Sequence, residues 1–141
     1  MTYYRNYDTK DDILTEYSYY LCELLSSELK NCKDLDQRKY LLITFDFYKR
    51  HKRFALALKK LHKETLTLDI INRNIELMPV DEDTRLAMHY YAGGIYNILT
   101  DWLKSDRKDE EWVVDKIITL TDNDTIAEGL TQYTALYKKL D

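Results

Sequence analysis

Turn-forming residues are scarce in this chain. Its 141 residues include three glycines and one proline, although chains with many tight turns use both residue types often. Leu, Lys, Glu, Asp and Tyr dominate instead, and this composition suits helices joined by short connections. An all-β or α/β fold would need more turn residues. We therefore expect an all-α fold, a single domain of six or seven helices around one core.

Helix starts and helical spacing can be located along the sequence. Thr9 and Asp12 have the spacing of a capping box, which predicts a first helix over residues 10–31. Thr125 and Glu128 predict a second capping box near the C-terminus, and Pro79 marks a boundary because the residue before proline is pushed out of the α region. Apolar stripes predict the other helices, around residues 40–48, 54–61, 66–77, 86–105, 110–120 and 126–140.

Charge and hydropathy exclude some classes of protein. No apolar segment approaches the roughly 20 residues that cross a bilayer, and residues 1–5 lack the apolar region of a signal peptide. We therefore expect a soluble cytoplasmic protein with no membrane partner. The net charge of −4 argues against non-specific nucleic-acid binding by the whole chain, because such binding depends on neutralising phosphates.

Residues that carry chemistry are sparse. Cys22 and Cys32 stand alone, without a CxxC pair or histidines at metal-ligand spacing, so we expect reduced structural thiols and no metal site. The three histidines are scattered, and no catalytic motif or phosphate-binding glycine loop is present. Acidic pairs fall at expected helix starts, where the helix dipole explains them. We expect no enzymatic activity and no cofactor.

Two segments resemble the TetR family of transcriptional regulators. Residues 2–14, TYYRNYDTKDDIL, resemble the end of the family's recognition helix and the start of the helix that follows it. Residues 89–104, HYYAGGIYNILTDWLK, resemble a tyrosine-, glycine- and tryptophan-bearing helix of one C-terminal subclass from low-GC Gram-positive bacteria. Finding both segments in the family's order is less expected by chance than finding either one.

The resemblance implies a division of the chain and a function. Residues 1–9 would be a remnant of the DNA-binding headpiece, and residues 10–141 a helical domain that binds a small-molecule effector and forms a homodimer. Tyr4 and Lys10 occupy positions that touch DNA phosphates in intact relatives. A helix-turn-helix needs a supporting first helix, so we expect residues 1–8 to be frayed or rearranged and operator DNA to be bound only with a complete headpiece.

The family's dimer is a four-helix bundle, which implies an interface on the glycine-bearing helix and its successor. Gly93 and Gly94 in mid-helix cost about 1 kcal/mol each relative to alanine, and close approach of another helix would compensate. The alternative is that the pair accommodates a neighbouring helix of the same protomer. The expected interface comprises Tyr90, Gly94, Asn97, Ile98, Asp101, Trp102, Trp112, Val113 and Ile117.

The family also implies an effector pocket, mostly apolar with a few polar groups. Aromatic residues lie on the helices that would surround it, although for any single tyrosine plain core packing is the better explanation. Phe45 and Tyr48 belong to this wider aromatic set. The expected pocket residues are Tyr17, Tyr20, Phe47, Phe54, His89 and Tyr91.

The basic residues between positions 49 and 63 leave three interpretations open. They form a solvated helix face, the entrance for an anionic effector, or an accessory nucleic-acid contact. Their alternation with Phe54, Leu58 and Leu61 favours the solvated face.

A second function also stays open. The chain can be a helical interaction module without a ligand, pairing with intact TetR-type regulators. An enclosed cavity between the first helix and the helix that bears Tyr91 favours an effector domain, and a solid core favours such a module.

Overall fold

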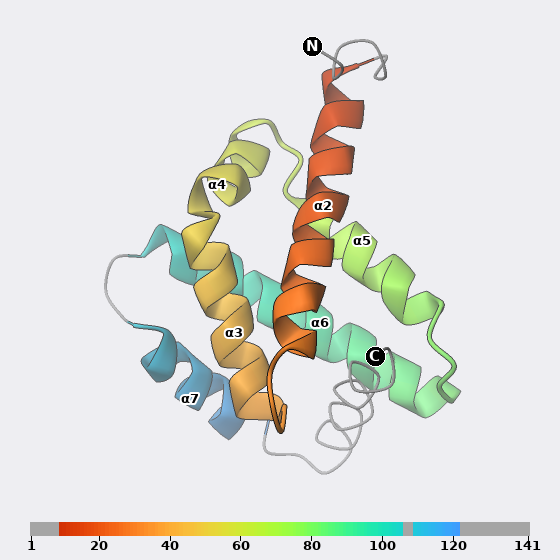
Figure 1. Ribbon diagram of the computed structural model, residues 1–141, viewed down its shortest axis with the longest axis vertical. Coiled ribbons are helices and arrows are strands. Elements are labelled where there is room, and N and C mark those ends of the chain that lie inside the picture. Colours follow the sequence, from red (N-terminus) through yellow and green to blue (C-terminus); the bar gives the residue numbers. More distant parts are fainter. Residues whose placement is uncertain (1–8, 106–108, 122–141) are drawn as a thin grey trace.

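A computed structural model describes residues 9–105 and 109–121 of the chain. This part contains six α-helices and no strand (Figure 1), so the predicted all-α fold is confirmed for it. The helix predicted over residues 126–140, with its capping box at Thr125 and Glu128, lies outside the described residues. The six helices are α2 (Lys10–Lys30), α3 (Gln37–Arg50), α4 (Lys52–Lys60), α5 (Thr65–Glu76), α6 (Glu82–Lys104) and α7 (Glu110–Leu120).

Side-chain caps fix the starts of four helices. The capping box predicted at α2 is confirmed: the Asp12 backbone N–H donates to the Thr9 hydroxyl, and the Thr9 N–H donates to the Asp12 carboxylate, both over 3.2 Å. Asp36, Asp81 and Asp109 cap α3, α6 and α7 by accepting a backbone N–H three residues later. These caps satisfy backbone donors that have no partner within a helix.

The break between α3 and α4 is a single residue. His51 has φ −107° and ψ 25°, outside the helical region, and serves as the C-cap of α3 and the N-cap of α4. Lys49 and Arg50 occupy the last turn of α3, where positive charge interacts favourably with the helix dipole. The predicted boundary at Pro79 is confirmed too, because α5 ends at Glu76 and its C-cap is Leu77.

The helices pack around α3 and α6. In Figure 1, α2 and α3 lie side by side and cross in front of α6, while α7 lies against α3. α5 packs along the first half of α6 and also contacts α2. The Phe45 ring of α3 contacts the Trp102 ring of α6, with centroids 5.3 Å apart. The core that these contacts form comprises Leu21, Leu41, Phe45, Phe47, Tyr48, Tyr91, Ile95, Leu99, Trp102, Leu103, Val113, Val114 and Ile117.

No helix in the described ranges combines the length and apolar character that a membrane crossing requires.

Phe45 is the side chain whose loss should cost most stability. It is fully buried between α3 and α6, so we expect Phe45→Ala to lower the free energy of unfolding by about 3–5 kcal/mol, through lost apolar burial and the cavity left behind. Urea denaturation followed by far-UV circular dichroism measures the change. The exposed Leu77 provides the control, since Leu77→Ala removes little buried surface. Equal effects of the two substitutions would contradict the described core.

Candidate ligand-binding site

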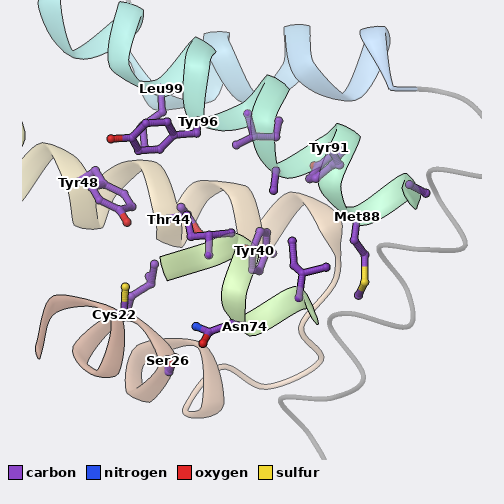
Figure 2. Close-up of a pocket in the computed structure, with 16 residues that line it drawn as sticks. Cys22, Ser26, Tyr40, Thr44, Tyr48, Asn74, Met88, Tyr91, Tyr96 and Leu99 are labelled. Atoms are coloured by element: carbon purple, nitrogen blue, oxygen red, sulfur yellow. The ribbon is translucent and has the colours of Figure 1, made fainter. Parts of the chain in front are cut away.

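A cavity of about 100 Å³ lies between α2, α3, α5 and α6 (Figure 2). The cavity therefore lies between α2, the first described helix, and α6, the helix that bears Tyr91. All four helices contribute side chains to its wall. The lining residues are Cys22, Leu25 and Ser26 of α2, Tyr40, Thr44 and Tyr48 of α3, Ile71, Asn74 and Ile75 of α5, and Ala87, Met88, Tyr91, Ala92, Ile95, Tyr96 and Leu99 of α6.

Helical spacing explains why these residues meet. Tyr40, Thr44 and Tyr48 follow one another at intervals of four on α3, so they share one face. Figure 2 shows these three side chains between α3 and the remaining walls of the cavity. Small side chains on α6, those of Ala87 and Ala92, leave the space that longer ones would fill.

Thr44 is the polar group of the cavity without a partner. Its side chain is 6% exposed, and its hydroxyl forms no hydrogen bond within the described part of the chain. A buried hydroxyl that lacks a partner costs about 1–3 kcal/mol of desolvation. The mostly apolar wall therefore includes a buried hydroxyl without a hydrogen-bond partner among the described residues.

The phenol groups of α6 in the cavity wall are uncharged at neutral pH. Burial raises the pKa of Tyr91 to about 12, partly offset by the hydrogen bond that Gln37 Nε2 donates to its hydroxyl over 3.5 Å. Burial also raises the pKa of Tyr96, whose hydroxyl donates to the Glu64 carbonyl over 2.6 Å. None of the 16 lining residues is Asp, Glu, Lys, Arg or His.

Cys22 lies in the cavity wall as a neutral thiol. Burial, with a smaller contribution from Glu23, raises its pKa to about 11. A thiol of that pKa is a poor nucleophile at neutral pH, because the thiolate is the reactive form. Both Cys22 and Cys32 are free thiols.

A surface groove reaches the cavity from outside. Cys22, Ser26 and Asn74 line both the cavity and an open groove between α2 and α5, whose outer walls include Glu23 and Lys30. The cavity therefore opens toward the solvent beside these three polar side chains.

Of the six residues expected in the pocket, Tyr91 lines the cavity and the other five do not. Tyr17 and Tyr20 are exposed on α2, where Tyr17 packs on Phe54 of α4 with ring centroids 4.7 Å apart. Phe47 is fully buried near His51. It does not face the cavity because it lies about 100° around α3 from Tyr48.

His89 lies outside the cavity because it pairs with residues of α5. Its Nε2 lies 2.5 Å from the Glu76 carboxylate and its Nδ1 3.1 Å from Asn72 Oδ1. In the wider aromatic set, Tyr48 lines the cavity and Phe45 packs on Trp102.

Sequence reasoning missed Thr44 and the residues of α5. The signal for Thr44 was its place between Tyr40 and Tyr48 in the same stripe. Ile71 and Asn74 belong to the apolar stripe predicted on this segment, whereas Ile75 does not. Nothing in the sequence indicates which helix covers these residues.

The residues expected at the dimer interface separate into two groups. Tyr90, Gly94, Asn97, Asp101 and Trp112 are exposed, and Ile98 is half-buried. Trp102, Val113 and Ile117 instead belong to the core of the protomer. They are buried because Trp102 meets Phe45, and because the apolar face of α7 packs against α3.

No helix among the described residues packs closely against the two glycines of α6. A Cβ atom added at Gly93 or Gly94 would meet no atom of the described residues within 4 Å. The described residues therefore supply no helix for which the pair makes room.

Several side chains of the basic run are paired with acids of other segments. Lys49 lies 2.9 Å from Glu110, and Arg50 lies 2.7 Å from Glu28. Lys63 pairs with Asp11 over 3.2 Å. These exposed pairs contribute little stability, and they favour the solvated-face interpretation of the run.

The remaining expectations concern contacts with DNA phosphates and metal ligands. Lys10 is exposed at the start of α2, whereas Tyr4 lies outside the described residues. Within residues 9–105 and 109–121, no group of three or more His, Cys, Asp or Glu side chains is placed to hold a metal ion.

Comparisons with known proteins identify no relative. No family model matches the chain, and neither the curated proteins nor the solved structures include a significant match. The TetR assignment therefore stays a prediction.

Removing the Thr44 hydroxyl should stabilise the protein. We expect Thr44→Val, which keeps the shape of the side chain, to raise the free energy of unfolding by about 1 kcal/mol because an unsatisfied buried hydroxyl disappears. Thr67 is the matched control: it is buried to the same degree, but its hydroxyl bonds Tyr96. Thr67→Val should lower stability by about 1 kcal/mol. Urea denaturation compares the two, and destabilisation by both would mean that Thr44 has a partner.

Cys22 should react slowly with iodoacetamide in the native protein. At pH 8, a thiol with a pKa of about 11 rather than 9 holds about a hundredfold less thiolate. The rate is measured in a Cys32→Ser background, so that one thiol reports, and is compared with the rate in urea. Equal native and unfolded rates would contradict the burial of this thiol.

Proposed function

We propose that this chain is the effector-binding and dimerisation part of a TetR-type transcriptional regulator. It senses a small molecule, pairs with a second copy, and binds operator DNA only in a form with a complete headpiece. A cytoplasmic location belongs to the same proposal.

One observation carries the proposal: α6 has two opposite faces with different environments. Tyr91, Ile95 and Leu99 point into the cavity. Tyr90 and Gly94, on the other side of the helix, are exposed, and Tyr90 retains 73% of its accessible surface. A helix with a ligand on one side and a second protomer on the other is the connection that a ligand-controlled dimer requires.

The exposed face of α6 has features that suit a two-fold contact. Leu86 is 71% exposed and lies four residues before Tyr90 on the same face as Gly94, Asn97 and Asp101. Large exposed apolar side chains favour an interaction surface when they cluster. Gly94 permits the backbones of two helices to approach closely, and the cost of a mid-helix glycine is then offset by the packing gained.

The switch follows from population shift. A ligand that prefers one arrangement of α2, α3, α5 and α6 raises the population of that arrangement in proportion to its differential affinity. Because α6 bears the pairing face, the two protomers change their relative position with it. In a protein with a complete headpiece, that change alters the spacing of the two DNA-reading units.

A helical interaction module without a ligand is the second candidate, and the size of the cavity favours it. About 100 Å³ is below the roughly 300–1,000 Å³ of ordinary ligand pockets. Both candidates predict pairing through α6, and only the regulator requires a ligand.

Gly94→Leu tests the pairing. We expect the wild-type chain to be a dimer whose mass is independent of concentration, and the variant to be a folded monomer. A Cβ atom added at Gly94 meets no atom of the described protomer within 4 Å, whereas the leucine side chain would collide with a second helix. Light scattering over a range of concentrations measures both masses.

Gly93→Ala is the control, because it brings the same gain in helix propensity without bulk and should leave the dimer intact. A monomeric wild-type chain, or a variant that remains a dimer, would remove the α6 interface from the proposal.

A further inference from the structure

The cavity indicates the chemistry of its ligand. We propose that it binds an uncharged molecule the size of a single aromatic ring, which carries one hydroxyl group that hydrogen-bonds Thr44. This inference rests on the proposed ligand-sensing function and specifies its ligand class.

The wall of the cavity excludes a charged ligand. A buried charge without a counter-charge is far more costly than a buried neutral polar group. The cavity wall offers no charged side chain, and burial keeps Cys22 and Tyr91 neutral. A carboxylate or an ammonium group in this space would therefore lose its hydration without compensation.

The volume of the cavity limits the size of the ligand. An engineered cavity of roughly 150 Å³ binds benzene, and the cavity here measures about 100 Å³. A single ring with one small substituent requires only minor movement of the wall. Fused rings would require separation of the surrounding helices.

The buried hydroxyl of Thr44 favours a ligand that forms a hydrogen bond with it. The Thr44 hydroxyl is buried without a partner, so a ligand that bonds it also removes an existing cost. A threonine hydroxyl both donates and accepts, and a ligand hydroxyl complements it in either direction. Thr44 lies between the rings of Tyr40 and Tyr48 on α3, which places the ligand hydroxyl beside aromatic surfaces.

The side chains of the cavity wall favour an aromatic ring in the ligand. Tyr40, Tyr48, Tyr91 and Tyr96 all line the cavity, and Met88 adds a thioether. Aromatic pairs gain stability beyond their buried area, and methionine sulfur contacts rings favourably. Entry past Ser26 and Asn74 offers polar contacts to a hydroxyl on the way in.

A set of matched probes tests the charge, the size and the hydroxyl group of the ligand with the full chain. Benzyl alcohol is the expected binder, toluene lacks the hydroxyl, benzoate and benzylamine carry opposite charges, and 2-naphthalenemethanol adds a second ring. Titration calorimetry supplies the dissociation constants. We expect benzyl alcohol to bind at least tenfold more tightly than benzoate, benzylamine or 2-naphthalenemethanol.

Two variants assign the binding to the cavity. Thr44→Val should weaken benzyl alcohol binding about tenfold and leave toluene binding unchanged. The control Thr100→Val alters a hydroxyl that bonds the Asn97 carbonyl outside the cavity, and it should change neither. Ala92→Leu fills the cavity and should abolish binding of both probes, whereas Ala57→Leu on α4, away from the cavity, should not.

Each other outcome overturns a defined claim. If an ionic or two-ring probe binds best and Ala92→Leu abolishes it, the ligand class is wrong and the ligand-sensing function stands. If Thr44→Val has no effect on benzyl alcohol, the hydrogen bond is wrong. If no probe binds while the wild-type chain forms the Gly94-dependent dimer, both the ligand class and the sensing function are overturned in favour of the interaction module.

Discussion

The burial of α3 is the constraint on which the rest of the structure depends. Its five buried residues are Leu41, Thr44, Phe45, Phe47 and Tyr48, and they occupy one wide face of the helix. Several neighbours are needed to cover so wide a face, and α3 contacts α2, α4, α6 and α7. Its charged residues are left at exposed positions, where Lys49 and Arg50 reach acids on α7 and α2.

The same constraint places a polar group in the interior. Thr44 occupies the α3 position between Tyr40 and Tyr48, so covering α3 also encloses its hydroxyl. Core packing alone would favour valine here, since valine has the same shape without the unsatisfied group. Departures from local consistency of this kind concentrate at functional sites, and the hydroxyl faces the largely apolar cavity that α6 and α5 complete.

Local rules were enough to predict the fold class and most helix boundaries. The scarcity of glycine and proline excluded folds rich in turns, the Thr9–Asp12 spacing located the start of α2, and Pro79 located the end of α5. Each of these features acts over a few residues of sequence. They do not depend on which helix packs against which.

The candidate site depended on pairing between helices, and there the sequence was a weaker guide. Periodicity places Val113 and Ile117 on one face of α7, but it does not say whether α3 or a second protomer covers that face. In the structure α3 covers it. The same limit applies to Phe47 and Tyr48, which are adjacent and both aromatic, yet only Tyr48 lines the cavity.

In the proposed regulator, the small size of the cavity is what would make α6 responsive. Close-packed interiors transmit strain and do not absorb it, so a ligand that fills the 100 Å³ space and presses on its walls would displace one of them. α2 and α3 pack directly on one another, whereas α6 has an exposed face opposite the cavity. Displacement would therefore be taken up by α6, and Tyr90 and Gly94 would move with it as parts of the same rigid helix. A larger cavity would admit the ligand without that movement and would separate binding from pairing.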